Sequence, residues 1–326
     1  MTKVRCAIVG LGRIGWMLER DRLREKPCTH AGAILDNDDC LLVGGCDIDP
    51  RRCRAFSDTF GISHTYTDSA ELLEETSPDI LHIATPTETH YSIMKAALSA
   101  DVKLLVCEKP LAENSRVASR VVKWQRQGRI KILLNHERRY SRDYLRAKRK
   151  INDGSFGEIL SVASWLYMGG SAAVNDVLLH DGTHLIDIIQ FLTGSELRLL
   201  SVQHFRERKA ETIVITGSSG FVPVTLVIGS GRHYILFELD INLSRGRIRI
   251  GNGLYEEYAS APSPFYEKMR SLKRTGGRRP KVTGYFRDML KDAVRCARDG
   301  RRTPLSSAEE GLSVLKFIDA VKRHVT

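Results

Sequence analysis

VRCAIVGLGRIG, at residues 4–15, is the stretch of sequence that decides the first part of the fold. Residues 4–9 are mostly apolar and rich in β-branched side chains, which predicts a short buried strand. Gly10, Gly12 and Gly15 follow directly, ahead of a helix-like segment. In this context the pattern predicts a dinucleotide site: Gly10 permits the tight turn, Gly12 lets the backbone approach a pyrophosphate, and Gly15 lets the helix pack closely. The N-terminus of that helix would present free N–H groups and a partial positive charge to the phosphates.

Asp47 ends the second predicted strand, residues 41–46. An acidic residue at this place accepts hydrogen bonds from the adenosine ribose, which favours NAD over NADP. Arg51 and Arg52 leave the alternative of a 2′-phosphate open, and a solvated strand-end carboxylate is the non-functional interpretation of Asp47. The distance from the glycines is about ten residues longer than the usual 20 or so. We therefore interpret residues 16–29 as an insertion near the mouth of the cofactor site, where a lid is one role for it.

Strand and helix patterns continue to alternate as far as residue 134. Strands are predicted at residues 80–84, 103–107 and 130–134, and helices at 68–75, 90–100 and 115–127, with Asp68 as an N-cap. This alternation predicts an α/β fold with a doubly wound parallel sheet, which binds ligands at the carboxyl ends of its strands. The candidate cofactor-binding residues lie at or near these ends: Gly10, Gly12, Arg13, Ile14, Gly15, Asp47, Ile48, Arg52, Ala84, Thr85, Pro86, Thr87, His90, Glu108 and Lys109.

Length and composition narrow the class of protein. The chain has 326 residues, of which 42% are hydrophobic and 27% charged, so it can build a packed core and is not a disordered chain. Its length predicts two domains. No apolar run approaches the roughly 20 residues that cross a bilayer. The N-terminus lacks the features of a secretory signal, so a cytoplasmic location is expected.

Seven cysteines are scattered along the chain, and no Cys-x-x-Cys spacing occurs. An odd, scattered set predicts neither a disulfide framework nor a zinc site. We expect most of them to be small buried apolar residues. They are Cys6, Cys28, Cys40, Cys46, Cys53, Cys107 and Cys296.

The formal net charge is +11, and the excess gathers at residues 138–150 and 268–281. Such clusters are typical of proteins that bind nucleic acid, a membrane surface or a phosphorylated small molecule. The alternative is a solvated helix face together with a surface loop. No helix-turn-helix, RRM or zinc-finger signature is present, so we expect neither a nucleic-acid nor a membrane partner. Residues 262–283 are interpreted as a basic loop inserted before the last helices.

At this point the sequence resembles the glucose–fructose oxidoreductase, inositol dehydrogenase and rhizopine-catabolism family, written Gfo/Idh/MocA. The resemblance covers nearly the whole chain. It rests on GLGRIG at 10–15, the strand end at Asp47, ATPTETH at 84–90, EKP at 108–110, NHERRY at 135–140, HDGTHLIDIIQFLTG at 180–194 and the closing segment 284–320. EKP followed by G-x-H-x-x-D is much more specific than the glycine pattern alone.

The resemblance implies a fold for both halves of the chain. We expect an NAD-binding Rossmann domain at 1–134 and, at 135–326, an α+β domain that binds substrate and forms the oligomer interface, in a homodimer or homotetramer. The second domain of the family has an open, mainly antiparallel sheet. Strand patterns with alternating apolar residues agree with this at 158–168, 197–207, 211–217, 221–229, 233–242 and 245–250.

The resemblance also implies NAD(P)-dependent oxidation or reduction of a sugar, cyclitol or related alcohol. Lys109 matches the lysine of EKP, and His184 matches the histidine of G-x-H-x-x-D. Histidine suits a general base because its ordinary pKa of about 6.5 lies near the working pH. Lysine suits a donor to the developing alkoxide. The candidate substrate-binding residues are Arg138, Arg139, Tyr140, Tyr167, Asp181 and His184, with linker charges as the alternative for the arginines.

One departure from the family pattern concerns the acidic residue that commonly precedes the catalytic histidine by four positions. His180 occupies that place, and Asp181 follows it. Either Asp181 takes the role after a local shift, or His180 contacts substrate or shares proton transfer with His184. Asp187 could orient the His184 ring from one helical turn away. The i, i+4 spacing of His180 and His184 would also suit zinc on a helix, but no third ligand is evident and no metal is expected.

The leading hypothesis is an NAD-dependent dehydrogenase that acts on a ring hydroxyl, at C3 of a nucleotide-linked N-acetylhexosamine such as UDP-GlcNAc. The arginine clusters suit a diphosphate, which favours this substrate class. The alternatives are a dehydrogenase of a free sugar, sugar phosphate or inositol, and a non-catalytic NAD-binding sensor.

Overall fold

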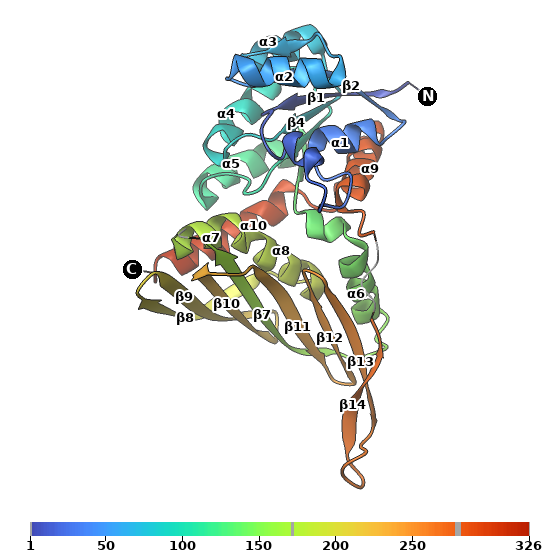
Figure 1. Cartoon of the computed structure of the whole chain (residues 1–326), viewed down its shortest axis with the longest axis vertical. Helices are drawn as coiled ribbons and strands as arrows, with labels where there is room; N and C mark the ends of the chain where they lie inside the picture. Colours follow the sequence, from blue (N-terminus) through green and yellow to red (C-terminus); the bar gives the residue numbers. More distant parts are fainter. Residues whose placement is uncertain (1, 171–172, 278–281, 326) are drawn as a thin grey trace. The chain divides into compact units, whose positions relative to one another are not determined.

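The computed structural model describes residues 2–170, 173–277 and 282–325. The chain divides into two compact units, each with a sheet of its own (Figure 1). The first unit combines Met1–Ser141 with Gly284–Leu312, and the second combines Arg142–Thr283 with Ser313–Thr326. The sequence-based domain limits, 1–134 and 135–326, stay a prediction. In the structure the chain returns to the first unit at Gly284–Leu312.

Six parallel strands form the sheet of the first unit, in the order β3-β2-β1-β4-β5-β6. The strands are β1 (Val4–Val9), β2 (Cys40–Cys46), β3 (Thr65–Tyr66), β4 (Ile80–Ile83), β5 (Leu104–Cys107) and β6 (Lys131–Leu134). Every residue of β4 and β5 is buried, as expected of central parallel strands that are covered on both faces. The predicted doubly wound parallel sheet is confirmed.

Helices alternate with these strands. They are α1 (His30–Leu35), α2 (Pro50–Phe60), α3 (Ser69–Thr76), α4 (Thr87–Ala97), α5 (Ser115–Arg126) and α9 (Tyr285–Arg298), with short 3-10 helices η1 (Met17–Arg20) and η2 (Glu137–Tyr140). Asp68 caps α3 as predicted, because its carboxylate accepts the Ala70 N–H at 2.6 Å. Although α9 lies near the C-terminus of the sequence, its Phe286 and Met289 are buried in the apolar cluster of β1 and α1.

Eight strands form the sheet of the second unit, in the order β14-β13-β12-β11-β7-β10-β9-β8. They are β7 (Ile159–Gly169), β8 (Leu197–Glu207), β9 (Ala210–Ser219), β10 (Val222–Arg232), β11 (Leu236–Leu243), β12 (Gly246–Gly251), β13 (Leu254–Pro262) and β14 (Arg270–Gly276). Among the described strands of this sheet, only the pair β7–β10 is parallel. The prediction of a mainly antiparallel sheet is confirmed.

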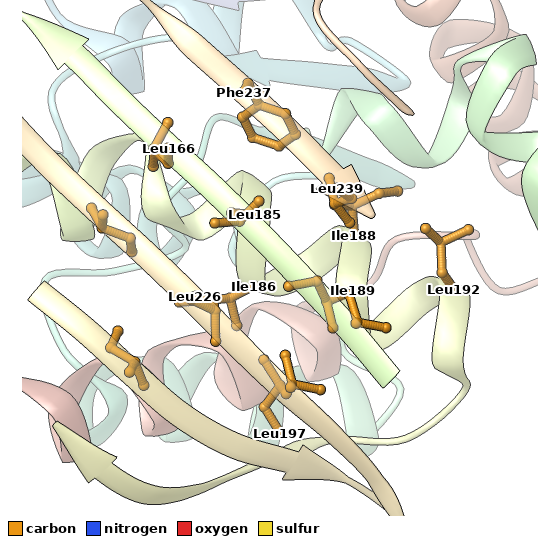
Figure 2. Packing of buried hydrophobic residues seen from close by; sticks show 14 of the residues in the cluster. Leu166, Leu185, Ile186, Ile188, Ile189, Leu192, Leu197, Leu226, Phe237 and Leu239 are labelled. Carbon is orange, nitrogen blue, oxygen red and sulfur yellow. The ribbon is translucent and has the colours of Figure 1, made fainter. Parts of the chain in front are cut away.

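Buried side chains from one face of this sheet pack against helices. The helices are α6 (Arg142–Asn152), α7 (Val174–His180), α8 (Gly182–Thr193) and the part of α10 (Ala308–Lys322) that follows Leu312. α8 is buried on most of its surface, and its Ile186 and Ile189 meet Leu226 of β10 in the same apolar cluster (Figure 2). A helix buried on most sides is typical of the inside of a domain.

The other face of the sheet is polar near β11–β13. Arg247 pairs with Asp240, and Arg249 binds Glu256 at 3.2 Å. These side chains alternate with buried residues such as Ile248 and Ile250, so they lie on the face away from the apolar core. Both arginines are half-buried and pair with acidic side chains on the same face of the sheet. This surface is therefore polar, and its charges largely cancel.

The interpretation of residues 262–283 as a loop was wrong in part. Arg270–Gly276 forms β14, which pairs antiparallel with β13 and closes a hairpin at the edge of the sheet (Figure 1). The strand was missed because RSLKRTG is polar on both faces and carries no apolar alternation. Residues 278–281 of the basic cluster lie outside the described residues.

All seven cysteines are free and buried, which confirms their prediction as small core residues. Among the described residues, no helix is both long and apolar enough to span a membrane.

A matched pair of leucines tests the packing of the second unit. Leu226 on β10 is 0% exposed, whereas Leu200 on β8 is 71% exposed. We expect Leu226→Ala to lower the free energy of unfolding by about 2–5 kcal/mol, because it removes buried methyl groups and leaves a cavity. Leu200→Ala should change it by less than about 0.5 kcal/mol. Urea unfolding measures both, and equal losses would contradict the assignment of the core.

Candidate active site

The glycine loop stands between the ends of β1 and β4. Gly10 has a φ of 97°, and a Cβ at this position would lie 2.5 Å from the carbonyl carbon of Ala84. Both the left-handed backbone and the close approach therefore require glycine. A Cβ at Gly15 would overlap the carbonyl oxygen of Gly10. The roles predicted for these two glycines, tight turn and close packing, agree with this geometry.

The helix expected after Gly15 is interrupted at residues 16–29, the segment interpreted from the sequence as an insertion. A helical turn starts in the loop, since Leu18 N–H donates to Arg13 O at 2.9 Å. The regular helix α1 begins only at His30. Its first N–H groups nevertheless reach back across the gap: His30 donates to Ile14 O at 3.2 Å, and Ala31 donates to Gly15 O at 2.9 Å. Residues 16–29 are therefore looped out of the first Rossmann helix.

The looped-out segment is held by its own polar contacts. The carboxylate of Glu19 accepts hydrogen bonds from Thr29 Oγ1 at 2.7 Å and from Cys28 N–H at 3.2 Å. Gly32 leaves the space that Glu19 fills, because a Cβ there would overlap its carboxylate. The ammonium of Lys26 donates to Leu18 O at 3.0 Å. The two ends of the insertion are thus tied together and to α1.

Asp47 is oriented by the backbone at the end of β2. Its Oδ2 accepts the Leu11 N–H at 2.9 Å, and its Oδ1 accepts the Asp49 N–H at 3.0 Å. Arg52 approaches the same carboxylate at 3.4 Å and would lie 3.6 Å from a Cβ at Gly12. The Asp47 carboxylate is thus a fixed hydrogen-bond acceptor beside the glycine loop, which fits a ribose hydroxyl. Arg52 lies next to this carboxylate.

These strand ends line a cleft of about 850 Å³ within the first unit. It includes ten of the predicted cofactor-binding residues: Gly10, Gly12, Arg13, Ile14, Asp47, Ile48, Arg52, Ala84, Thr85 and Pro86. The sequence analysis missed further lining residues, namely Val9, Cys46, Thr67, Asp68, Ser69, Glu88, Thr89, Ser92 and Ile93. Most follow β3 or lie on α4. β3 has two residues and was too short to be predicted, although Asp68 was identified as a cap.

Five of the predicted cofactor-binding residues are not lining residues of this cleft: Gly15, Thr87, His90, Glu108 and Lys109. The ring of His90 spans two strand-end loops, with Nε2 2.9 Å from Thr85 O and Nδ1 3.0 Å from Pro110 O. Burial lowers the pKa of His90, against the effect of these carbonyls. His90 therefore connects the loop after β4 to the EKP segment.

Glu108 belongs to a buried polar group behind the EKP segment. Its Oε1 lies 3.0 Å from Nε2 of His30 and 2.6 Å from Nδ2 of Asn135. His30 in turn lies 3.0 Å from His82, joined through their Nδ1 atoms. Sequence analysis had no role for His30, His82 or Asn135. The available signal was a histidine within the apolar strand ILHI at 80–83.

Glu137 lies where several positive charges of the first unit converge. Burial raises the pKa of its carboxyl, while the charges of Arg138, Lys109 and Arg24 act to lower it. Arg24 comes from the looped-out segment, so this insertion contributes a cation to the surroundings of the EKP lysine. Glu137 and Arg24 were not singled out from the sequence.

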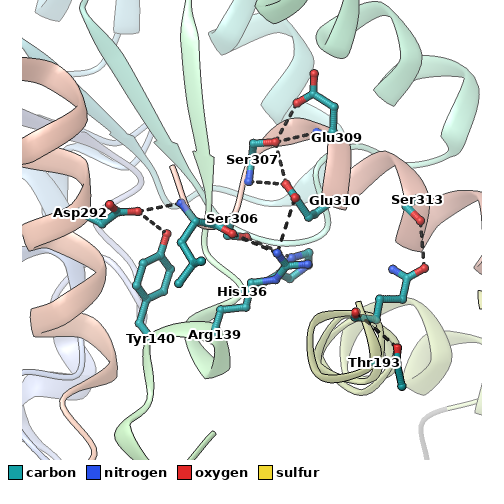
Figure 3. Close-up of polar contacts among 12 residues, drawn as sticks. His136, Arg139, Tyr140, Thr193, Asp292, Ser306, Ser307, Glu309, Glu310 and Ser313 are labelled. Atoms are coloured by element: carbon teal, nitrogen blue, oxygen red, sulfur yellow. Dashed lines mark hydrogen bonds and ion pairs between the residues drawn. The ribbon is translucent and has the colours of Figure 1, made fainter. Parts of the chain in front are cut away.

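The predicted substrate residues Arg139 and Tyr140 have partners inside the first unit (Figure 3). The buried Arg139 donates to Leu305 O at 3.0 Å, and the hydroxyl of Tyr140 donates to Asp292 at 3.1 Å. Burial is the main reason that the pKa of Tyr140 lies well above its ordinary value. Arg138 is half-buried and stays the better candidate of the three for substrate. A substrate role for any of them stays a prediction.

The remaining candidates lie in the second unit. α7 ends at His180, and α8 begins at Gly182, so His180 and His184 lie on different helices. His180 is exposed, and Asp181 and His184 are half-buried. Asp187 is buried one turn after His184, on the same helix as predicted. Among the described residues, no group of three or more His, Cys, Asp or Glu side chains could hold a metal ion.

Tyr167 lies on β7 and is half-buried. The guanidinium of Arg232 lies over its ring at 5.1 Å, and Tyr234 meets it edge-on at 6.2 Å between ring centroids. An aromatic ring with a cation on its face forms a small polar–aromatic surface. Its predicted contact with substrate stays a prediction.

The glycine loop, the oriented Asp47 and the cleft at the carboxyl ends of parallel strands define a dinucleotide-binding oxidoreductase of the Rossmann class. Residues 4–136 match the model of the Gfo/Idh/MocA family, which is described as an oxidoreductase family with an NAD-binding Rossmann fold. Its curated relatives are named inositol and apiose dehydrogenases. The protein is therefore an NAD-binding dehydrogenase of the sugar and polyol type, which acts on CH–OH groups.

Known proteins resemble the chain over most of its length. It is 26% identical to inositol 2-dehydrogenase of Salmonella typhimurium over 259 residues, which cover 74% of this chain and 72% of that protein. A dehydrogenase structure from Chromobacterium violaceum has a TM-score of 0.83 at 16% identity and covers 100% and 96% of the two chains. UDP-N-acetylglucosamine 3-dehydrogenase GnnA from Acidithiobacillus ferrooxidans has a TM-score of 0.74 at 16% identity, covering 100% and 98%. These structural likenesses show the shared fold.

Replacing Asp47 tests the cofactor preference. We expect Asp47→Asn to weaken NAD binding and strengthen NADP binding, because the amide no longer repels a 2′-phosphate and Arg52 lies beside it. The ratio of the two dissociation constants should shift by about tenfold or more, or about 1.4 kcal/mol. Titration calorimetry measures both constants. Asp49→Asn is the control, because Asp49 caps α2 outside the cleft. An unchanged ratio in Asp47→Asn would remove its assigned role.

The buried histidines predict a dependence of stability on pH. Burial, assisted by His30, holds the pKa of His82 well below its ordinary value, and burial lowers that of His90. The unfolded chain therefore binds more protons below about pH 6.5, and stability falls as pH drops from 7.5 to 5.5. His82→Leu should reduce this slope by up to about 1.4 kcal/mol per pH unit. Urea unfolding at both pH values measures it.

His64→Leu provides the control for this prediction. Its ring is exposed in the same unit and is hydrated in both the folded and unfolded states. The wild-type slope should persist in this variant. An equal slope in wild type and His82→Leu would show that His82 does not stay neutral in the folded protein.

Proposed function

We propose that this protein oxidises a ring hydroxyl of a nucleotide-linked sugar with NAD, at C3 of an N-acetylhexosamine such as UDP-GlcNAc. The observation that carries the choice of substrate class is the convergence of Lys109, Arg138 and Arg24 around Glu137 in the first unit. The carboxylate of Glu108 also acts on Glu137, so three cations face two carboxylates. The excess of one positive charge suits a diphosphate. The likeness in fold to UDP-N-acetylglucosamine 3-dehydrogenase is consistent with this proposal.

The residues of the first unit fit the cofactor. Gly10 and Gly12 expose backbone to a pyrophosphate, and the Asp47 carboxylate accepts from ribose hydroxyls. NAD, when bound, supplies the acceptor for the hydride. The chain itself must then remove the hydroxyl proton and stabilise the alkoxide that develops in the transition state.

We assign these two tasks to His184 and Lys109. A neutral imidazole at His184 accepts the hydroxyl proton, and the buried Asp187 on the next turn of α8 is placed to hold the ring. The ammonium of Lys109 donates to the oxygen as negative charge builds on it. His180 is exposed at the end of α7, so Asp181 is the better substitute for the acidic residue of the family pattern.

A dehydrogenase of inositol or a free sugar is the second candidate. It is favoured by the 26% identity to inositol 2-dehydrogenase over most of both chains. An uncharged polyol would make no use of Arg24 or Arg138. The two candidates therefore differ in the dependence of KM on these arginines.

The test is NADH formation with UDP-GlcNAc against myo-inositol. We expect activity with the sugar nucleotide, and Arg138→Ala and Arg24→Ala should each raise its KM about tenfold, since each removes a charged contact. Arg22→Ala is the matched control, because it removes an exposed arginine from the same insertion. NADH formation with myo-inositol alone would replace the first candidate by the second.

The same assay tests the two assigned catalytic residues. Lys109→Met and His184→Asn should each lower kcat by about a hundredfold or more. Lys103→Met is the control, because Lys103 forms a surface ion pair with Asp79. Full kcat in the Lys109 and His184 variants would overturn the assignment of these two residues, whereas wild-type protein that binds NAD but forms no NADH with any sugar would be an NAD-binding sensor.

A further inference from the structure

A continuous chain of polar side chains runs through the core of the first unit. It consists of His82 on β4, His30 at the start of α1, Glu108 after β5 and Asn135 after β6, and we call it the His82 chain. Their exposed fractions are 0%, 0%, 8% and 2%. Polar groups are stable at such depth only when they are hydrogen-bonded. The arrangement of hydrogens along the chain is therefore constrained.

Glu108 fixes the direction of the first hydrogen bond. Burial raises the pKa of its carboxyl, but the hydrogen bond and charge of His30, the charge of Lys109 and the hydrogen bond from Asn135 outweigh burial and lower the pKa. An ionised carboxylate only accepts hydrogen bonds. Nε2 of His30, 3.0 Å from Oε1, must therefore carry a hydrogen.

The contact between the two histidines then has two solutions. Their Nδ1 atoms are 3.0 Å apart, so one hydrogen lies between them. If it belongs to His82, both rings are neutral, and Nε2 of His82 is a bare lone pair. If it belongs to His30, that ring is an imidazolium, and His82 must carry its hydrogen on Nε2.

The surroundings of His82 decide between them. Its Nε2 is buried and has no hydrogen-bond partner among the described residues. In the neighbouring strands His82 is in register with Ile8 and Val106, and the ring of Phe286 packs on His30. A buried N–H without an acceptor loses its hydration with no replacement, whereas a bare lone pair loses less. The arrangement in which His82 donates from Nδ1 is favoured, because it leaves no buried N–H of His82 without an acceptor.

We propose that His82 is a positioning residue for the Glu108–Lys109–Pro110 segment, acting through His30 along this chain of hydrogen bonds. Oε1 of Glu108 receives His30 and Asn135 from two different elements, so the carboxylate cannot rotate without breaking one of them. The backbone that carries Lys109 is thereby held at the end of β5. The kinetic consequence rests on the proposed function of Lys109, but the arrangement of hydrogens does not.

The hydrogens are tested directly by NMR of the ring nitrogens in protein labelled with ¹⁵N-histidine. We expect His82 as the Nδ1–H form and a hydrogen on Nε2 of His30. Spectra of His82→Asn and His30→Gln assign the two rings. His82 as the Nε2–H form would overturn the proposal whether or not the protein oxidises a sugar.

The positioning role is tested with a matched set at residue 82. The amide of Asn places a donor where His has Nδ1, the amide of Gln places it where His has Nε2, and Leu has none. We expect His82→Asn to keep kcat within about threefold, and His82→Gln and His82→Leu to lower it by about ten- to a hundredfold. KM for NAD should change little, because none of the four residues of the His82 chain lines the predicted cofactor cleft.

A merely structural role would make the Asn and Gln variants equal, and that result, or full kcat in all three, would overturn the proposal. Variants of His30 test the proposal independently if a variant of His82 fails to fold. His30→Gln retains a donor for Glu108 but removes the Nδ1 atom that meets His82, so it should lower kcat about as much as His82→Leu. His30→Asn, which removes the donor to Glu108, should lower kcat further, and full kcat in His30→Gln would overturn the proposal. Wild-type protein that forms no NADH with any sugar, yet shows the expected ring hydrogens, would refute only the proposed function.

Discussion

Two backbone hydrogen bonds hold the nucleotide-binding unit together at its most interrupted point. His30 and Ala31 donate to the carbonyls of Ile14 and Gly15 across the looped-out residues 16–29. Without this closure the first Rossmann helix would end inside the glycine loop. With it, the loop keeps its backbone geometry beside Ala84, and His30 enters the core next to Glu108. The insertion can therefore add cations such as Arg24 at the surface while the sheet beneath it is unchanged.

Much of the fold was predictable from the sequence because burial leaves strong periodic signals. The apolar strands at 80–84 and 103–107 and the cap at Asp68 could be recognised from single residues and short runs. β3 and β14 could not, since one has two residues and the other is polar on both faces. The return of α9 to the first unit depends on contacts distant in sequence, such as Phe286 with the β1 and α1 cluster, which no local pattern reveals.

Part of the candidate site could likewise be predicted from the sequence, and part could not. The cleft residues that follow buried strands, such as Asp47 and Thr85, were found because parallel strands end at one edge of a sheet. The polar groups behind the edge were missed: His82 looks like one more residue of an apolar strand, and Asn135 looks like part of a linker. These polar groups can be recognised only from their hydrogen-bond partners. His82 and Glu108, the partners of His30, lie 52 and 78 residues from it in the sequence, so only tertiary packing brings them together.

The hairpin of β13 and β14 has a consequence for the behaviour of the protein in concentrated solution. β14 is the last strand of its sheet among the described residues, so no further described strand pairs with its outer side. Arg270, Lys273 and Arg274 place positive charge on this strand, so two such edges repel each other before their hydrogen bonds can form. The same basic residues that first suggested a ligand thus act as gatekeepers against open-ended strand addition.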